Sequence, residues 1–517
     1  MRTPSAILFL AVLSPCAAVA AEGATFAVVN ARVWTGVPGR PWAEAVAASG
    51  ERILVVGSNT EVRAASAPST RIVDAAGGLL TPGFIDSHIH LLSFDSGKPF
   101  PPIFMRFLSG KEAVAERVRS YAARLPKGAW ILGVDWTDAV WGERLPSRGW
   151  LDQLAPDHPV WLVKLEGNVG IANTAALRLA GMTLRTAEEP PGGIERDSSG
   201  EPTGVIRGGP MWRVEAALVE RSRERDDALL EREMTALLKM GVTSVHHNNS
   251  WQDFLILRRA RLAGKLRVRV YASPPLPSWP RLRDYIAAQG RGDAWMHWGA
   301  VKGFGAITEK AYYPWVAGAS QAGLQVMVHL GSTAELRILL GVYERVRREQ
   351  HLADPRFRLE HSHDTPADLI PLMVKAGAMA SWQPPLLAHF DLRTAAGQPP
   401  PKNLFPCRAL LEAGVKIAFG TDGQAMVGGI TSPVASLQMA LERAAPDGSR
   451  ITLDEALRAY TVDAAWAEFS ESEKGSLEPG KLADFVLFDS DFSRGPVGAI
   501  GQAKVRMTVV AGRVAYE

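Results

Sequence analysis

Two histidines separated by one residue, His88 and His90, are the first candidates for chemistry in the chain. On a β-strand both imidazoles would project from the same face, because side chains alternate along a strand. Two imidazoles on one face can bind a single metal ion, and histidine is the commonest metal ligand in proteins. The pair by itself is weak evidence, since strand histidines often only form hydrogen bonds. It predicts a metal site and leaves that simpler alternative open.

Four further ionisable residues each close a short apolar run: Lys302, His329, His361 and Asp422. Titratable groups at the carboxyl ends of parallel strands are what a (β/α)8 barrel presents to its substrate. Each residue also has a simpler interpretation. Lys302 could reach solvent or an acid. His361 could pair with its neighbour Glu360, and Asp422 could cap a following helix.

The elements that must position these residues fall into three segments. Residues 22–80 and 471–517 show short β-rich runs between turns, which predicts antiparallel strands from both chain ends in one discontinuous β-sandwich domain. Residues 81–470 alternate apolar runs with amphipathic stretches, which predicts an α/β fold with a (β/α)8 TIM-like barrel. A doubly wound sheet is the competing fold, but no glycine-rich phosphate loop follows an early strand.

Residues 1–21 read as a cleavable secretory signal, because their apolar stretch is far shorter than the roughly 20 residues that span a bilayer. We therefore expect an exported, periplasmic protein. Removing the signal removes Cys16 and leaves Cys407 as a lone cysteine. A disulfide within the chain and a zinc site built from thiolates are then both excluded, so any metal must bind through histidine and carboxylate ligands.

The composition is that of a globular protein, with 517 residues, 47% hydrophobic and 21% charged. The formal net charge of +3 is small and no Lys/Arg-rich run occurs, so neither nucleic acid nor an anionic membrane surface is implied. The expected partner is a small-molecule substrate, with no integral membrane span. The oligomeric state stays open, and a homodimer is one assembly that the sequence allows.

Several motifs together resemble the amidohydrolase superfamily, and within it the amidohydrolase 3 or YtcJ-like branch, which includes N-substituted formamide deformylases. The segment TPGFIDSHIH at 81–90 resembles its first barrel strand. The other matching segments occur in family order over most of the chain and are GAWILG at 128–133, LDQLAPDHPV at 151–160, EH at 360–361, GTD at 420–422, ITLDEALRAYT at 451–461 and GSLEPGKLAD at 475–484.

The resemblance implies a divalent-metal site, which we expect to hold one or two ions, with zinc as the expected metal. The implied ligands are His88, His90, Lys302, His329, His361 and Asp422. Lys302 matches a lysine that is carboxylated in many relatives, and only a carbamate would let it bind a cation. Asp422 is the implied catalytic base and acid for water attacking a carbon–nitrogen bond of a small amide, formamide or cyclic amide.

Three positions are predicted to contact substrate: Trp136, Asn168 and His247. Relatives usually carry a histidine where this chain has Asn168, in the segment LEGN at 165–168, and an amide cannot shuttle a proton. The segments at 204–208 and 303–308 also depart from the family pattern. Two alternatives therefore remain. In the first, the same metal site catalyses decarboxylation or cleaves a lactone or phosphoester. In the second, the chain is an exported binding protein whose active site has decayed.

Overall fold

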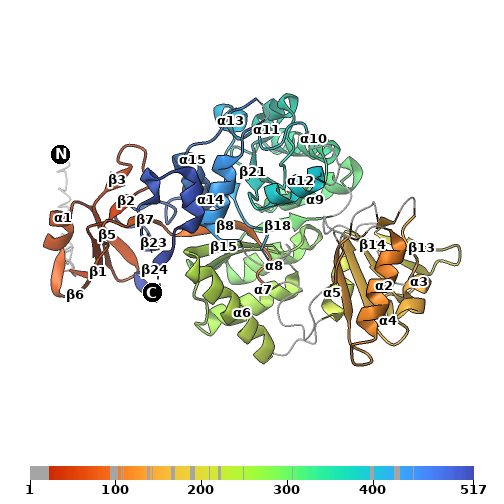
Figure 1. The fold of residues 1–517 in the computed structure, drawn as a ribbon. Coiled ribbons are helices and arrows are strands. Elements are labelled where there is room, and N and C mark those ends of the chain that lie inside the picture. Colours follow the sequence, from red (N-terminus) through yellow and green to blue (C-terminus); the bar gives the residue numbers. More distant parts are fainter. Residues whose placement is uncertain are drawn as a thin grey trace, which may run out of the picture.

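The computed structural model describes residues 23–92, 103–105, 108, 110–136, 140–141, 144–164, 169–184, 186, 193–208, 210–218, 223–248, 250–304, 307–395, 401–423, 431–445 and 447–517. The predicted signal peptide at 1–21 and Asn168 lie outside these ranges. Figure 1 shows a β-rich unit with the first and last strands at one end, a central α/β body, and a smaller α/β unit at the other end. No helix in the described ranges is long and apolar enough to cross a membrane.

The β-rich unit contains two sheets, and strands from both ends of the chain share the second. The first sheet has the order β5-β4-β1-β6 and contains β1 (Ala24–Val29), β4 (Ala45–Ser49), β5 (Arg52–Gly57) and β6 (Ser66–Asp74). The second has the order β25-β24-β23-β7-β2-β3 and contains β2 (Arg32–Trp34), β3 (Trp42–Ala43), β7 (Leu79–Pro82), β23 (Phe485–Phe488), β24 (Val505–Val510) and β25 (Arg513–Tyr516).

Apolar side chains of both sheets form one buried cluster, which includes Phe26, Leu80, Phe485 and Met507. β7 pairs with β23 in antiparallel register, so backbone hydrogen bonds join the two ends of the chain. The expectation of purely antiparallel strands is wrong in two places, since β1 pairs with β6, and β2 with β7, in parallel. A parallel pair needs a crossover connection, and the segment from β4 through β5 and α1 (Asn59–Ala64) provides it for β1 and β6.

The central body is built on two sheets in which every strand pairing is parallel. One has the order β17-β16-β15-β8 and contains β8 (Phe84–Ile89), β15 (Val242–Asn248), β16 (Arg269–Ser273) and β17 (Met296–Trp298). The other runs from β18 to β22 in chain order and contains β18 (Ala300–Gly303), β19 (Gln325–His329), β20 (Phe357–Glu360), β21 (Ala378–Trp382) and β22 (Ile417–Phe419).

Isolated parallel bridges connect these sheets on both sides, one between Pro275 and Lys302 and one between Ile89 and Gly423. The described strands thus form two parallel sheets joined at single bridges, not one continuous closed ladder. The predicted βα alternation is present, because helices lie between most successive strands, although only Gly299 separates β17 from β18. The helices are α6 (Arg223–Lys239), α7 (Trp251–Leu262), α8 (Trp279–Gln289), α9 (Glu309–Gln321), α10 (Thr333–Glu349), α11 (Ile370–Ala376), α12 (Leu386–Ala395), α13 (Cys407–Glu412), α14 (Pro433–Glu442), α15 (Leu453–Ala459) and α16 (Val462–Ala467).

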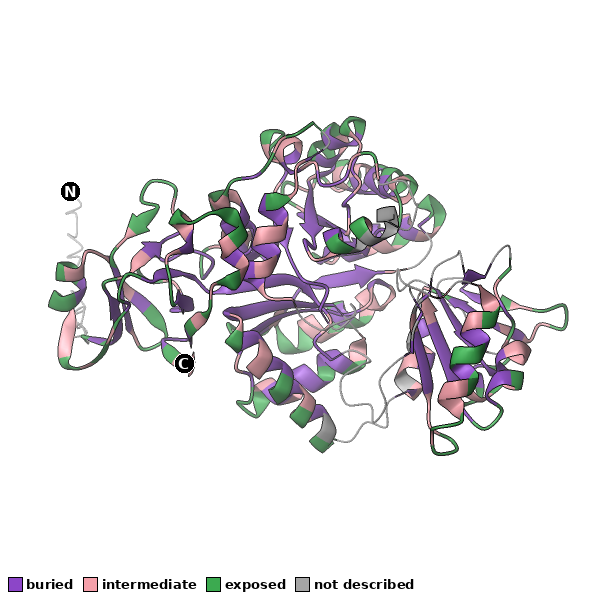
Figure 2. Cartoon of the chain, viewed as in Figure 1, coloured by how far each residue is buried: buried purple, intermediate pink, exposed green. Residues whose placement is uncertain are grey.

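Helix α10 illustrates how the sequence dictates this packing. Ser332 caps its N-terminus by accepting a hydrogen bond from the backbone N–H of Glu335. Its buried residues follow the three-to-four spacing of one helix face and are Leu336, Leu339, Leu340, Val342, Tyr343 and Val346. Figure 2 shows the same pattern throughout the central body, where buried strands lie inside helices whose outer faces are exposed.

A separate unit interrupts the central body and was not foreseen from the sequence, which assigned all of 81–470 to one barrel domain. Its sheet has the order β13-β14-β12-β11-β10-β9 and contains β9 (Ile103–Phe104), β10 (Ile131–Trp136), β11 (Val160–Lys164), β12 (Val169–Ala172), β13 (Ile194–Arg196) and β14 (Pro202–Arg207). Its helices are α2 (Lys111–Ala122), α3 (Arg148–Leu154), α4 (Thr174–Leu179) and α5 (Met211–Ala217). Two apolar clusters form its own core. Strands and helices alternate at its start as in the central body, but β11 with β12 and β13 with β14 are consecutive strands that pair in antiparallel register.

A buried ion pair joins the central body to the β-rich unit. Arg269, the first residue of β16, donates two hydrogen bonds to Asp484, of 2.5 and 2.9 Å. Both side chains are almost fully buried. Asp484 precedes β23 and ends the segment at 475–484 that matched the family, so this motif residue has a structural role.

We expect Asp484→Ala to lower the free energy of unfolding by about 3–5 kcal/mol, because it leaves the Arg269 guanidinium buried without its partner. Replacing both residues together by Met and Leu should cost much less, since no unpaired charge remains. The measurement is urea denaturation. Asp368→Ala, which breaks the exposed pair with Arg337, is the matched control and should cost at most about 1 kcal/mol. Equal losses for the two single variants would contradict the prediction.

Candidate metal centre

The structure brings the predicted ligand residues to neighbouring strand ends of the central body. His88 lies in β8, Lys302 in β18 and His329 is the last residue of β19. His361 follows β20 directly, and Asp422 follows β22. Because these strands run in parallel, their carboxyl ends meet on one side of the body.

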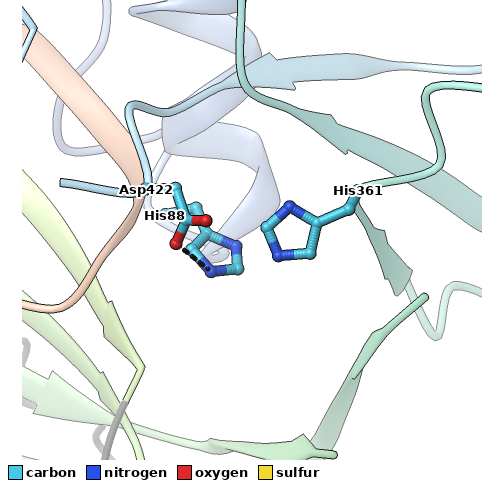
Figure 3. A group of neighbouring side chains, drawn as sticks. All are labelled: His88, His361 and Asp422. Atoms are coloured by element: carbon cyan, nitrogen blue, oxygen red, sulfur yellow. Dashed lines mark ion pairs between the residues drawn. The ribbon is translucent and has the colours of Figure 1, made fainter. Parts of the chain in front are cut away.

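The closest group consists of His88, His361 and Asp422, whose ligand atoms all lie within 4.8 Å of one another. Figure 3 shows His88 and Asp422 side by side, with the ring of His361 facing them. Oδ1 of Asp422 lies 3.4 Å from Nε2 of His88 and 3.2 Å from Nε2 of His90. The ring centroid of His329 lies 4.6 Å from that of His361. The two predicted histidines outside the closest group therefore border it.

The side chains fit a divalent metal ion. Among the described residues, no hydrogen bond satisfies Nε2 of His88 or Oδ1 of Asp422, and both atoms are buried. A buried polar atom without a partner is costly, and a cation bound between these atoms would satisfy both. Imidazole nitrogens with carboxylate oxygen are the ligand types of zinc sites that lack thiolates. Cys407, in α13, is buried and forms no disulfide.

The imidazoles have the protonation state that a metal requires. Burial lowers the pKa of His88 to about 4 and the pKa of His329 to about 3, with the charge of Lys302 acting in the same direction. Burial also holds the pKa of His361 well below its usual value. Neutral imidazole is the ligating form, so near pH 7 these rings need not lose a proton to bind a metal.

Lys302 is fully buried, so its side chain does not reach solvent. Its Nζ has no hydrogen-bond partner among the described residues and lies 5.1 Å from the ring centroid of Phe304. Burial lowers the pKa of Lys302 to about 8. An amine with a lowered pKa is partly neutral near pH 7, which is the form that can react with carbon dioxide.

Among the described residues, neither an ion pair of His361 with Glu360 nor a helix cap by Asp422 is observed. Glu360 contacts the imidazole of His88, and the helix after Asp422, α14, is capped by Ser432. Both His361 and Asp422 instead have left-handed backbones, with φ of 66° and 55°. Such backbones are uncommon outside glycine and occur at functional sites, where the surrounding structure holds them in place.

Asp86 connects the first and last strands of the central body beneath the site. Its Oδ1 accepts hydrogen bonds from the backbone N–H groups of His88 and Thr421, at 3.1 and 3.0 Å, and its Oδ2 accepts from the Thr421 hydroxyl. The backbone N–H of Asp422 also donates to the carbonyl of His88, at 2.8 Å. These bonds fix Asp422 relative to His88. Asp86 was not among the predicted site residues, although it lies within the family segment at 81–90.

Of the three residues predicted to contact substrate, the structure describes Trp136 and His247. Trp136 is fully buried in the core of the inserted unit, and its Nε1 donates to the carbonyl of Leu162 at 3.1 Å. The structure thus gives Trp136 a packing role in this core, and its contact with substrate stays a prediction. His247 is 2% exposed, and its Nδ1 accepts a hydrogen bond from the backbone N–H of Leu91 after β8, at 3.1 Å. Asn168 lies outside the described residues.

Comparison with known proteins decides the family. The model of the amidohydrolase family matches residues 71–516. The chain belongs to the amidohydrolase family. It is 30% identical to the N-substituted formamide deformylase of Arthrobacter pascens over 95% of this chain and 98% of that protein. It is also 30% identical to protein LONG AFTER FAR-RED 3 of Arabidopsis thaliana, over 98% of this chain and 93% of that protein. The putative amidohydrolase YtcJ of Bacillus subtilis is 23% identical over 87% of this chain and 91% of that protein.

Solved structures agree with the fold of this amidohydrolase. An uncharacterized metal-dependent hydrolase from Pyrococcus horikoshii superposes with a TM-score of 0.66 at 21% identity, covering 92% of this chain and 99% of that chain. Atrazine chlorohydrolase TrzN from Arthrobacter aurescens, complexed with zinc, gives a TM-score of 0.57 at 17% identity over 95% of each chain. The amidohydrolase is thus a metal-dependent hydrolase that acts on carbon–nitrogen bonds, in the YtcJ-like branch predicted from its motifs.

Proposed function

We propose that this amidohydrolase cleaves the carbon–nitrogen bond of a small formamide, amide or cyclic amide with a metal-activated water. The observation that carries the proposal is the ligand group of buried His88, half-buried His361 and buried Asp422, in which buried ligand atoms of His88 and Asp422 have no hydrogen-bond partner among the described residues. The full-length similarity to an N-substituted formamide deformylase supports the substrate class. The position of the site supports it too, if the two parallel sheets are the halves of a (β/α)8 barrel, whose active site lies at this face.

In this proposal His88, His90, His329, His361 and Asp422 hold the metal, and zinc suits their imidazole-rich set. A divalent ion supplies a Lewis acid that lowers the pKa of water and polarises the substrate carbonyl. A carbamate on Lys302 would add a carboxylate ligand for a second ion. The lysine is already buried, without a hydrogen-bond partner among the described residues, beside this group.

Asp422 has the proton-transfer role. Its Oδ1 lies 3.4 Å from Nε2 of His88 and 3.2 Å from Nε2 of His90. Its backbone N–H donates a hydrogen bond to the carbonyl of His88, which holds the residue in place. A carboxylate held in this way can accept the proton of the attacking water and return it to the leaving nitrogen. We further propose that residues 1–21 direct the chain to the periplasm, where the reaction takes place.

The test uses protein freed of metal with a chelator and then reloaded with Zn²⁺. We expect the metal-free protein to be inactive, and the reloaded protein to release amine and formate from one or more N-substituted formamides. A panel of simple amides, cyclic amides, lactones and phosphoesters defines the bond that is cleaved. Turnover that survives metal removal, or turnover of lactones or phosphoesters with no amide cleaved, would overturn the proposal.

The carbamate on Lys302 makes a separate prediction. Lys302→Met keeps the length of the side chain and removes the amine, so we expect reconstituted protein to bind less Zn²⁺ per chain. In the wild type, added bicarbonate should raise the bound Zn²⁺, whereas the variant should not respond. Metal analysis after gel filtration measures both effects. The control is Lys416→Met. Lys416 directly precedes β22 and its ammonium pairs with Asp463 on α16, so this variant should respond to bicarbonate as the wild type does. Identical behaviour of Lys302→Met and the wild type would rule out the carbamate.

A further inference from the structure

A connected set of buried charged side chains extends from His88 through the interior of the central body. In order of contact the set, which we name the polar column, consists of His88, Glu360, Arg358, His246, Glu468 and Lys474. The side chains of all six are at most 5% exposed. The interior of a (β/α)8 barrel, the fold expected for this body, is mostly filled by branched aliphatic residues, so a column of charges requires an explanation other than packing.

At the His88 end, the contact with Glu360 determines which nitrogen of His88 carries the proton. Oε2 of Glu360 contacts Nδ1 of His88 through a short hydrogen bond. An ionised carboxylate only accepts, so Nδ1 must carry the hydrogen. Nε2 of His88 then keeps its lone pair, and this is the atom that faces Asp422. The contact with Glu360 thus places the free lone pair on the metal side of the ring.

Arg358 in turn fixes Glu360. Its Nε donates to Oε1 of Glu360 at 2.8 Å. Burial raises the pKa of Glu360, but Arg358, Lys302 and His88 together hold that pKa well below its usual value. The remaining guanidinium nitrogens donate to Nδ1 of His246 at 2.7 Å, to the carbonyl of Ser87 at 2.5 Å and to Oγ of Ser381 at 3.2 Å. An arginine held by four partners on four strands has little freedom to turn.

At the Lys474 end of the column, His246, Glu468 and Lys474 complete the balance of positive and negative charges. Because the guanidinium can only donate, Nδ1 of His246 must accept, and the proton of this ring lies on Nε2. That nitrogen faces Oε1 of Glu468 at 3.5 Å, and Nζ of Lys474 lies 2.7 Å from the same oxygen. Two cations and two carboxylates therefore compensate one another. Burying such pairs rarely stabilises a fold more than apolar residues of the same volume would, so stability alone does not account for the column.

We propose that Arg358 is a positioning residue that acts through Glu360 to hold His88 in the tautomer with a free Nε2 for the metal. The inference deepens the proposed function and rests on it, since it requires that His88 bind a metal. The Arg358 side chain touches Ser87 and Glu360 next to the site but none of the ligand atoms, so its effect on the metal is indirect.

Glu360→Gln provides a sharp test because it keeps the shape of the side chain. Arg358 can only donate, so it will take the amide oxygen of the new residue and turn the amide NH2 towards His88. Nδ1 of His88 must then accept, and the proton moves to Nε2, where it blocks the metal. We expect the affinity for Zn²⁺, measured by chelator competition, to fall by about 10- to 100-fold. The absorption bands of the Co²⁺-loaded protein should shift as well, because the set of ligands changes.

The double variant Arg358→Met/Glu360→Gln separates positioning from stability. Without the arginine the glutamine can turn its oxygen to Nδ1 of His88, so we expect part of the Zn²⁺ affinity and the original Co²⁺ spectrum to return. Glu471→Gln, next to Arg356 at 2.8 Å and outside the column, is the matched control and should bind Zn²⁺ as the wild type does.

Each outcome decides a different point. Wild-type affinity and spectrum in Glu360→Gln would overturn the inference while leaving the proposed function intact. A loss of affinity in Glu360→Gln that the double variant does not relieve would overturn the role of Arg358. Failure of the wild type itself to bind Zn²⁺ would overturn the proposed function and, with it, the inference.

Discussion

Replacing Asp422 by asparagine is expected to lower kcat by about 10²- to 10⁴-fold, the usual contribution of a general acid or base, while metal content falls much less. Asparagine keeps the size of the side chain and one oxygen that can face His88 and His90, but it cannot take up a proton. It also tolerates the left-handed backbone of this position, where φ is 55°, so the backbone should be retained.

The measurement is kcat and bound metal on the same preparation of Asp422→Asn, with the formamide that the substrate panel identifies. The matched control is Asp463→Asn, a buried aspartate on α16 that pairs with Lys416 and lies outside the ligand group. This control should keep its turnover. Wild-type turnover in Asp422→Asn would refute the proton-transfer role. A fall in activity that only follows the loss of metal would reduce Asp422 to a ligand.

His361→Ala is expected to have the largest effect on metal binding itself. The ring lies between the other ligands, with its centroid 4.6 Å from those of both His88 and His329. Loss of a direct ligand should cost more than the loss of a residue behind it, so we expect Zn²⁺ affinity to fall by more than about 100-fold. Activity should be lost in proportion to the metal.

His351→Ala is the natural control for that experiment. His351 also has a left-handed backbone, with φ of 51°, but its side chain is exposed at the end of α10. Both variants therefore place alanine on an equally unfavourable backbone, and only one removes a proposed ligand. Calorimetric titration of metal-free protein with Zn²⁺ compares them. Similar affinities for the two variants would exclude His361 from the metal site.

The sequence was sufficient for the types of chemical group and their order along the chain. Short apolar runs that end in His88, His329 or Asp422 are local features, and strand and helix periods can be read over a few residues. The β-rich runs predicted in 22–80 and 471–517 were equally local, and both segments contain strands of the β-rich unit. The family motifs extended this information to the whole chain.

The tertiary structure decided how those groups act, because contacts between distant residues leave no local pattern. The carboxylate of Glu360 holds His88 across 272 positions of sequence, although its neighbour in the chain is His361. Trp136 was predicted to contact substrate, and only the fold showed that it packs in the separate core of the inserted unit. Arg358 looked like an ordinary strand residue, and only the parallel packing of its neighbours gave it four buried partners. The sequence by itself determined the candidate ligands, and only the packing of the strands decided how they are buried and which charged groups they contact.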